Sequence, residues 1–220
     1  MGTPVKFGGM YRLILISLLI ASSSAASLVA QSAAVSITDE PHHKRLLYTN
    51  DLRLWDVTLR PGESTQPFVH EYDVASVVIG DGTLALERNG EAAAPPSPNA
   101  RGSVVIAEHT GRRTTYRIEN KGTTDYRAFE IENVHEQKQS PPFVVSDLML
   151  KAGAPESMHQ HMGATIIVLI SGTLQQGGIG GEEPVRISQP GQWLALPRFQ
   201  GHTVMAVGAT DARAIEIEVR

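Results

Sequence analysis

An internal repeat constrains the fold of this chain more than any other feature of its sequence. Residues 121–132 and 207–218 are identical at eight of twelve positions, at an offset of 86 residues. Upstream of them, the tripeptide at 82–84 recurs at 172–174, at an offset of 90. Similarity at a fixed spacing indicates that one structural unit occurs twice in the chain.

The difference between the two offsets indicates that the first copy contains a longer connection. We place this connection in the proline- and alanine-rich segment 90–98. The two copies then extend over roughly 40–135 and 142–220, with a polar linker at 136–142. The chain has 220 residues, which is long enough for two such domains.

Both copies have the sequence pattern of all-β domains. Short runs rich in Val, Ile, Leu and Thr, such as 104–107, 166–170 and 214–219, alternate with clusters of Gly, Pro, Asn and Asp. Sustained helical periodicity does not occur downstream of the N-terminal segment. Short, closely spaced strands of this kind favour a β-sandwich or a β-barrel.

The repeated segment itself alternates apolar residues with glutamates. Successive side chains of a strand point to opposite faces of the sheet. Phe129 and Ile131 in the first copy, and Ile215 and Ile217 in the second, are therefore expected to face a core. We interpret the glutamates between them as solvated surface residues.

The second copy contains a set of histidines with the spacing of metal ligands. His159 and His161 are two residues apart, so on a strand both imidazoles lie on the same face. Both imidazoles of the His159–His161 pair can therefore reach one metal ion. His202 follows about forty residues later, shortly after Pro197.

The spacing around His159 and His161 resembles the first sequence motif of the cupin superfamily. That motif reads Gly, five residues, His-x-His, three or four residues, Glu, six residues, Gly. Gly153 and Gly172 occupy its two glycine positions, and Thr165 stands where the motif has Glu.

The segment around His202 resembles the second cupin motif. Gly191, Pro197 and His202 are in register with it, whereas Phe199 replaces a glycine and Ala206 replaces an asparagine. The resemblance implies two tandem jelly-roll β-barrels, a bicupin, with a metal inside the second one. It also implies that His159, His161 and His202 are the ligands.

The predicted ligand set and its surroundings constrain the chemistry. Three neutral imidazoles suit one divalent transition metal, Fe, Zn, Cu or Ni, better than Mg or Ca. The inward-facing positions predict a largely apolar pocket without a carboxylate. Its expected lining residues are Thr165, Ile167, Leu169, Val204 and Ala206.

The first copy retains little of this pattern. Phe68 stands in the place of His159, Tyr116 in the place of His202, and His70 alone matches a ligand position. We interpret this copy as structural, as an interface, or as a metal-free pocket for a small molecule. The remaining histidines lack partners at ligand spacing and are interpreted as ordinary residues: His42, His43, His109 and His135.

The N-terminus has the pattern of a secretory signal peptide. Lys6 and Arg12 precede an apolar run at 13–20, and small residues follow. The run is shorter than the roughly 20 residues of a membrane-spanning helix. We therefore expect residues 1–30 to be removed and the mature protein to be exported, periplasmic or extracellular, without a membrane span. An uncleaved membrane anchor is the alternative.

Composition excludes several classes of function. The chain has no cysteine, which excludes disulfides, thiolate metal sites and a cysteine nucleophile. Its formal net charge is −4, and no basic stripe with interleaved aromatic residues occurs. Nucleic-acid binding therefore has no electrostatic basis in this sequence.

Three functions of different classes are compatible with these features. The first is a metal-dependent enzyme acting on a small organic substrate, since three-histidine cupins resembling this chain include dioxygenases. The second is a non-catalytic protein that binds a small molecule such as a sugar or an acid. The third is a structural protein whose barrels pair in a homodimer. Metal analysis of protein purified without added metal is the most informative single experiment.

Overall fold

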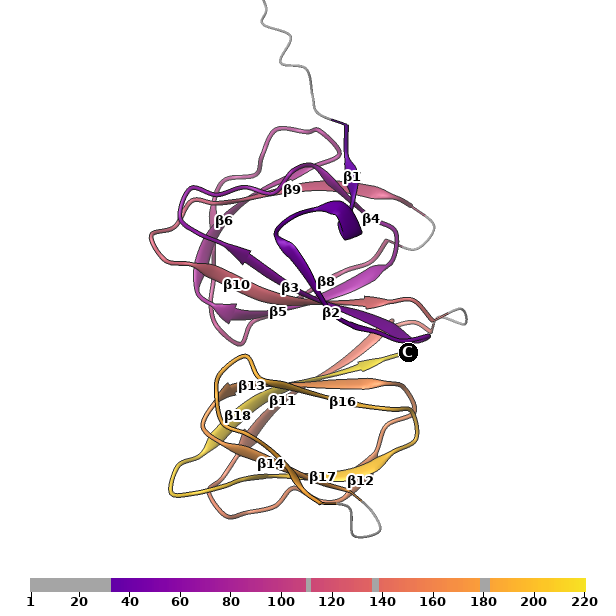
Figure 1. The fold of residues 1–220 in the computed structure, drawn as a ribbon, viewed down its shortest axis with the longest axis vertical. Coiled ribbons are helices and arrows are strands. Elements are labelled where there is room, and N and C mark those ends of the chain that lie inside the picture. Colours follow the sequence, from indigo (N-terminus) through magenta and orange to yellow (C-terminus); the bar gives the residue numbers. More distant parts are fainter. Residues whose placement is uncertain (1–32, 110–111, 136–138, 179–182) are drawn as a thin grey trace, which may run out of the picture. The chain divides into compact units, whose positions relative to one another are not determined.

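The structure is a computed structural model that describes residues 33–109, 112–135, 139–178 and 183–220 (Figure 1). The predicted signal peptide, residues 1–30, lies outside the described residues. Apart from a short 3-10 helix at Ile37–Asp39, every described element is a β-strand. No helix within these ranges is long and apolar enough to cross a membrane.

Residues 35–133 form two five-stranded sheets (Figure 1). The strand order in one sheet is β1 (Val35–Ser36), β4 (Phe68–His70), β9 (Thr114–Asn120), β6 (Gly82–Arg88) and β7 (Ser97–Asn99). The order in the other is β2 (His43–Tyr48), β3 (Leu52–Leu59), β10 (Tyr126–Asn133), β5 (Asp73–Gly80) and β8 (Val104–Ala107).

Residues 143–219 form two four-stranded sheets. The strand order in one is β11 (Phe143–Leu150), β18 (Ala212–Val219), β13 (Thr165–Ser171) and β16 (Trp193–Leu196). The order in the other is β12 (His159–Gln160), β17 (Gly201–Ala206), β14 (Leu174–Gly178) and β15 (Val185–Ile187). Among the strands described, none of this half pairs with a strand of the first half.

The two halves have the same topology, as the repeat predicted. The order β3-β10-β5-β8 corresponds to β11-β18-β13-β16, and β4-β9-β6-β7 corresponds to β12-β17-β14-β15. The register agrees as well, because Phe68 pairs with Tyr116 where His159 pairs with His202. The first half has β1 and β2 in addition. Each half is therefore one barrel built from two sheets, called here the first and the second barrel.

The repeated glycine at the start of β6 and just before β14 is required by a close approach of the chain. A Cβ atom on Gly82 would lie 2.8 Å from the Cβ atom of Tyr126. A Cβ atom on Gly172 would lie 2.5 Å from the carbonyl oxygen of Asp211, and Gly172 also has a φ of 79°. Both glycines lie where the chain crosses the beginning of β10 or β18, which explains why the repeat retains them.

The apolar residues of the repeated strand face a core, as predicted. Phe129, Ile131, Ile215 and Ile217 belong to one buried cluster to which both barrels contribute. A second cluster fills the inside of the second barrel, and a third lies inside the first. The β10 and β18 sheets are therefore covered on both faces.

The interpretation of the intervening glutamates as solvated is wrong. Glu130 and Glu132 are 5% and 1% exposed, and Glu216 and Glu218 are 2% and 4% exposed. Alternation of apolar and acidic residues in a strand suggests that one face is exposed to solvent. In β10 and β18, however, the apolar face packs between the barrels and the acidic face points into the barrels. Because an ionised carboxylate without a partner is costly to bury, each of these glutamates requires a buried partner.

Candidate metal centre

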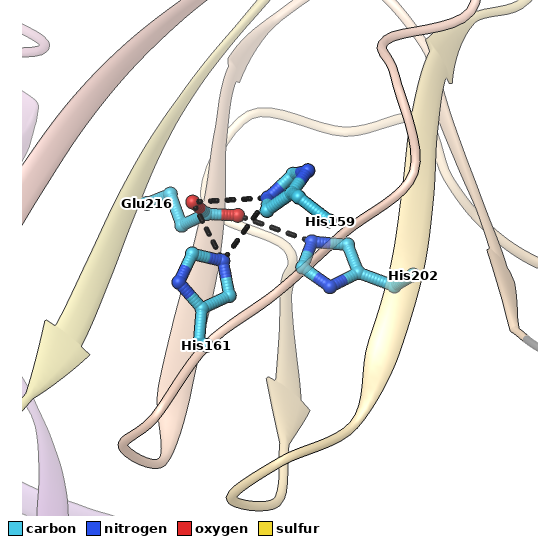
Figure 2. A group of neighbouring side chains, drawn as sticks. All are labelled: His159, His161, His202 and Glu216. Carbon is cyan, nitrogen blue, oxygen red and sulfur yellow. Dashed lines mark hydrogen bonds and ion pairs between the residues drawn. The ribbon is translucent and has the colours of Figure 1, made fainter.

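The three predicted histidines converge inside the second barrel (Figure 2). His159 lies on β12 and His161 immediately after it, and their Nε2 atoms are 3.1 Å apart. His202 lies on the neighbouring strand β17, directly opposite His159 in the register. The pairing of two short strands thus brings residues some forty positions apart to the same place.

Glu216 completes this group from strand β18. Its Oε1 atom lies 3.0 Å from Nε2 of His161 and 3.8 Å from Nε2 of His159. Its Oε2 atom lies 3.3 Å from Nε2 of His202. One donor atom from each of the four residues lies within 4.8 Å of the others, so the group can hold a metal ion. Among all described residues, it is the only group of three or more potential ligands this close together.

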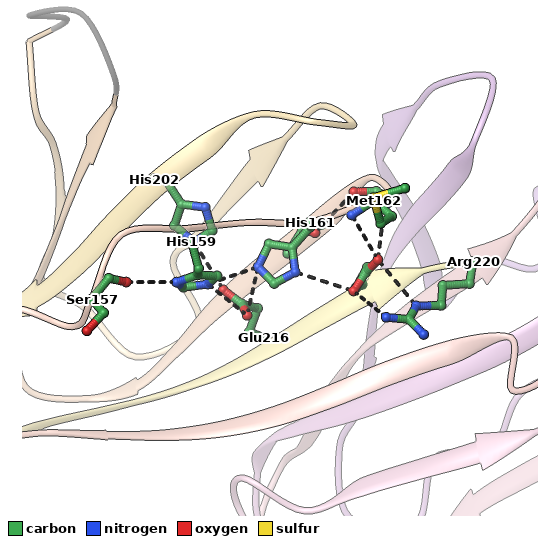
Figure 3. A network of polar contacts seen from close by, with 10 residues as sticks. Ser157, His159, His161, Met162, His202, Glu216 and Arg220 are labelled. Carbon is green, nitrogen blue, oxygen red and sulfur yellow. Dashed lines mark hydrogen bonds and ion pairs between the residues drawn. The ribbon is translucent and has the colours of Figure 1, made fainter.

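The outer nitrogens of two of these histidines have partners (Figure 3). Nδ1 of His159 lies 3.0 Å from the carbonyl oxygen of Ser157. Nδ1 of His161 lies 3.4 Å from Oε2 of Glu218. Metal-binding histidines commonly donate one ring N–H to a carbonyl or a carboxylate, which leaves the other nitrogen free for the metal. The arrangement fixes both rings with Nε2 toward Glu216.

Glu218 is itself held firmly. It accepts hydrogen bonds from the backbone N–H groups of Met162 at 3.1 Å and Gly163 at 3.0 Å, and the guanidinium of Arg220 lies 3.3 Å away. Burial alone would raise its pKa, but Arg220, the Gly163 N–H and His161 outweigh burial and lower it. Glu218 is therefore a fixed carboxylate that orients His161.

The charge of Glu216 is favoured by its surroundings. Burial would raise the pKa of this carboxyl group, but the hydrogen bond from His202 and the charges of His161, His202 and His159 lower it. The carboxylate and His202 are almost fully buried, whereas the side chain of His159 is 31% exposed. The group thus has a buried side and a side that solvent and small molecules can reach.

The expectation that no carboxylate faces the inside of the barrel is wrong. The cupin motif places a glutamate at the position of Thr165 on β13. Here the carboxylate comes instead from Glu216 on the neighbouring strand β18. Thr165 is 1% exposed, and its hydroxyl donates to the carbonyl oxygen of Gly163. A signal for Glu216 existed in the repeat, since both copies retain glutamate at this position, as Glu130 and Glu216.

The other predicted pocket residues lie inside the second barrel but do not line the cavity beside the histidines. Ile167, Leu169, Val204 and Ala206 are packed together in its core cluster. The cavity has a volume of about 400 Å³. It is lined by Ser146, Leu148, Glu156, Ser157, His159, His161 and Glu216. The predicted residues thus belong to the apolar core of the second barrel. The lining of the cavity beside the histidines is more polar than the sequence predicted.

Solved structures of several cupin proteins resemble this fold. A cupin 2 conserved barrel domain protein from Leptotrichia buccalis is 16% identical, with a TM-score of 0.53, over 81% of this chain and 88% of that one. Oxalate decarboxylase from Bacillus subtilis is 10% identical, with a TM-score of 0.60, over 84% and 76%. Salicylate 1,2-dioxygenase from Pseudaminobacter salicylatoxidans is 10% identical, with a TM-score of 0.59, over 80% and 76%.

This chain has the cupin fold. At such low identities the likeness shows the fold alone, so the chemistry of this chain has to be argued from its own residues. No family model and no curated protein matches its sequence.

The first barrel contains more buried histidines than its sequence suggested. His43 and His109 are 6% and 2% exposed, and neither belongs to the group of potential metal ligands. Nδ1 of His43 lies 2.6 Å from Glu40, and the ring of His109 stacks on that of His70 with centroids 5.5 Å apart. Strand β2, which carries His43, has no counterpart in the second barrel, so the repeat gave no indication of its position.

Proposed function

We propose that the second barrel binds one divalent transition metal through Nε2 of His159, His161 and His202 and a carboxylate oxygen of Glu216. The observation that supports this proposal most directly is the convergence of four donor atoms within 4.8 Å. The anchoring of His159 and His161 through their Nδ1 atoms supports it further, because it presents both Nε2 atoms to one point.

The donor set favours particular metals. Imidazole nitrogens suit Zn, Cu, Fe and Ni, whereas a carboxylate oxygen also suits Mn. Three nitrogens with one oxygen therefore favour Mn, Fe, Ni, Cu or Zn over Mg and Ca. A solved structure of the same fold, oxalate decarboxylase from Bacillus subtilis, is described as having Mn(II) centers, which places Mn among the metals to test first.

We propose further that the site acts on a small organic substrate, with dioxygenase-like chemistry as the first candidate. When bound, the metal supplies Lewis acidity and, if it is redox-active, electron exchange with dioxygen. The chain contributes the cavity of about 400 Å³ on the exposed side of His159, where Ser146 and Ser157 can donate hydrogen bonds to a polar substrate. Leu148 gives this cavity an apolar wall.

Glu156 is the cavity residue best placed to hold or transfer a proton. It lines the cavity, and its Oε2 atom is shielded from solvent without a hydrogen-bond partner in the protein. The backbone N–H of Glu156 donates to the carbonyl oxygen of Val204, which fixes the residue beside β17. A carboxylate in this position, outside the proposed ligand set, can accept a proton from a bound substrate.

Metal analysis tests the metal centre. Protein purified without added metal is analysed by inductively coupled plasma mass spectrometry, as wild type, His161→Ala and Glu216→Gln. We expect about one metal ion per chain in the wild type and little in either variant. His42→Ala, which removes a half-buried histidine of the first barrel, is the matched control and should retain the metal. Equal metal content in the wild type and His161→Ala would contradict the proposal.

Activity is tested with the substrates that the names of the structural neighbours suggest. Oxygen uptake and product formation are followed with salicylate and with oxalate, for the metal-loaded wild type and for Glu156→Gln. Turnover that disappears in Glu156→Gln, with the metal retained, would support a catalytic function. Binding of either acid without turnover would support the alternative, a non-catalytic protein that binds small molecules.

We also propose that the protein is exported, on the basis of the N-terminal sequence pattern alone. N-terminal sequencing of protein from the native host should begin near residues 26–30 rather than at Met1. Recovery of protein that begins at Met1 from a cytosolic fraction would contradict export without affecting the metal site.

A further inference from the structure

The first barrel contains a cavity that the proposed metal site does not use. Its volume is about 280 Å³, and its lining residues come from both sheets of this barrel. Most of the wall is apolar, with Phe68, Val78, Ile118 and Tyr126 among its residues. Since a cavity of about 150 Å³ accommodates benzene, this one has room for a single ring with substituents.

One part of the cavity wall is polar and deeply buried. His70 and Glu130 line the cavity, and they are 4% and 5% exposed. Nε2 of His70 lies 3.4 Å from Oε2 of Glu130. Ligand sites typically combine apolar walls with a few fixed polar groups that orient the ligand, and this pair has the position of such a group.

The polar pair is positioned by a further histidine. Nε2 of His43 lies 3.4 Å from the same oxygen of Glu130. Burial lowers the pKa of both His43 and His70, but Glu130 together with Glu40 outweighs burial for His43, and Glu130 together with Glu132 outweighs it for His70, so both pKa values are raised. The pKa of Glu130 is lowered by the same two histidines, against the effect of burial. An anionic carboxylate thus lies between two cationic imidazoles.

The charges around this pair are balanced within the protein. The other nitrogen of His70 lies 3.5 Å from Glu132, and that of His43 lies 2.6 Å from Glu40. Arg53 lies 3.8 Å from Glu132 on the outer side. Three carboxylates therefore face three cationic groups. A charged ligand would add an uncompensated charge in a buried place, whereas a neutral hydroxyl can both donate to a carboxylate and accept from an imidazolium.

The cavity has an accessible side. Leu86 and Val105 line it and are 41% and 52% exposed, although both are large and apolar. They lie on β6 and β8, on different sheets of the barrel. A small molecule can therefore enter the cavity between these two strands. Its ring would contact the apolar side chains of Leu86 and Val105 at the entrance and the apolar wall further inside.

We propose that the first barrel binds a small neutral molecule that has about one ring and a hydroxyl group. The ring lies against Phe68 and Tyr116, and the hydroxyl reaches the His70–Glu130 pair. Phe68 and Tyr116 stand at the positions of His159 and His202 in the second barrel. The proposal does not depend on the metal site, because none of the residues involved belongs to the second barrel.

The test uses benzyl alcohol as the probe, together with toluene, benzoate and benzylamine. The full-length protein with its metal removed is titrated with each compound, and the ring resonances of His70 and Tyr116 are followed by NMR. We expect saturable binding of benzyl alcohol, at least tenfold weaker binding of toluene, and no saturation with either charged compound. Equal affinity for toluene or benzoate would overturn the role given to the His70–Glu130 pair.

A pair of tryptophan substitutions localises the binding. Val105→Trp introduces a large side chain at the accessible side of the cavity and should weaken binding of benzyl alcohol at least tenfold. Met149→Trp is the matched control, because Met149 is 70% exposed on the second barrel, and it should bind like the wild type. Unchanged binding in Val105→Trp, or no saturable binding of benzyl alcohol to the wild type, would overturn the proposal. His161→Ala should bind the probe normally, which separates this result from the outcome of the metal test.

Discussion

The two barrels have the same strand order but surround the same inward-facing glutamate differently. In the second barrel, Glu216 lies among three histidines whose Nε2 atoms point toward it. In the first barrel, the equivalent Glu130 lies between His70 and His43. The second arrangement leaves donor atoms within 4.8 Å of one another for a metal, whereas the first neutralises the carboxylate with protonated histidines.

The difference shows that the same buried acidic position can be compensated in two ways. A carboxylate inside a barrel needs a compensating positive charge. A metal ion can supply that charge in the second barrel. In the first barrel, the additional strand β2 brings His43 to the carboxylate instead. Two aromatic rings, Phe68 and Tyr116, occupy the remaining ligand positions and border a cavity.

Among the variants that test this difference between the barrels, Glu130→Ala is expected to have the largest effect, a loss of stability. Removing the carboxylate leaves His43 and His70 buried without their shared partner, and breaking such a pair costs roughly 3–5 kcal/mol. The free energy of unfolding is measured by chemical denaturation. Glu87→Ala is the control, since its ion pair with Arg117 at 3.8 Å lies at the surface and should contribute less than about 1 kcal/mol. A similar loss in both variants would remove the proposed role of Glu130.

The sequence allowed the fold and three of the four clustered residues to be predicted. The repeat and the spacing of His159, His161 and His202 depend on local features, namely strand periodicity and turn position. Glu216 was not found, because its role depends on which face of β18 is covered by the other barrel. His43 was not found for a similar reason, since its strand β2 pairs with β3 only in the first barrel. In both cases the position of the side chain depends on contacts between strands that are far apart in the sequence, which periodicity within one strand does not reveal.

The second prediction concerns the pH dependence of the first barrel. Burial lowers the pKa of His70, but Glu130 and Glu132 outweigh it and raise the pKa to about 9, above the value of about 6.5 in an unfolded chain. The stabilisation is therefore complete below pH 6.5 and is lost as the pH rises through 9. The groups facing His70 include Glu130, Glu132 and His109, and burial together with His70 lowers the pKa of His109 to about 4, so His109 stays neutral in this range.

The measurement compares the free energy of unfolding of the metal-free protein at pH 6.5 and pH 9.5. We expect the wild type to lose a few kcal/mol between these values, and Glu130→Gln to lose much less. His43 contributes in the same direction, because its pKa is also raised. A wild-type stability that does not change between the two pH values would contradict the charge assignment in the first barrel.

The third prediction concerns the carboxylate behind the second site. Glu218→Gln should reduce metal affinity about 10–100-fold without abolishing binding, because Glu218 orients His161 and is not among the four clustered residues. A competition titration with a metal chelator measures the change. Asp147→Asn on β11, whose carboxylate pairs with Arg213 at 2.9 Å and is half exposed, is the matched control. Complete loss of metal in Glu218→Gln would contradict this orienting role and indicate that Glu218 binds the metal directly.

The smallest effect is expected from an attempt to convert the first barrel into the second. Phe68→His together with Tyr116→His would place imidazoles opposite one another, in the register that His159 and His202 have in the second barrel. His70 and Glu130 already occupy the other two equivalent positions. We expect a second, weaker metal-binding site, seen as a metal content above that of the wild type when excess Mn or Zn is supplied. The site should be weak because His43 competes for Glu130, and Phe68→His alone should add no metal. A folded double variant that binds no additional metal would contradict this expectation. It would show that the two barrels differ in more than the residues at the four equivalent positions, and the additional strand β2 would be the first difference to test.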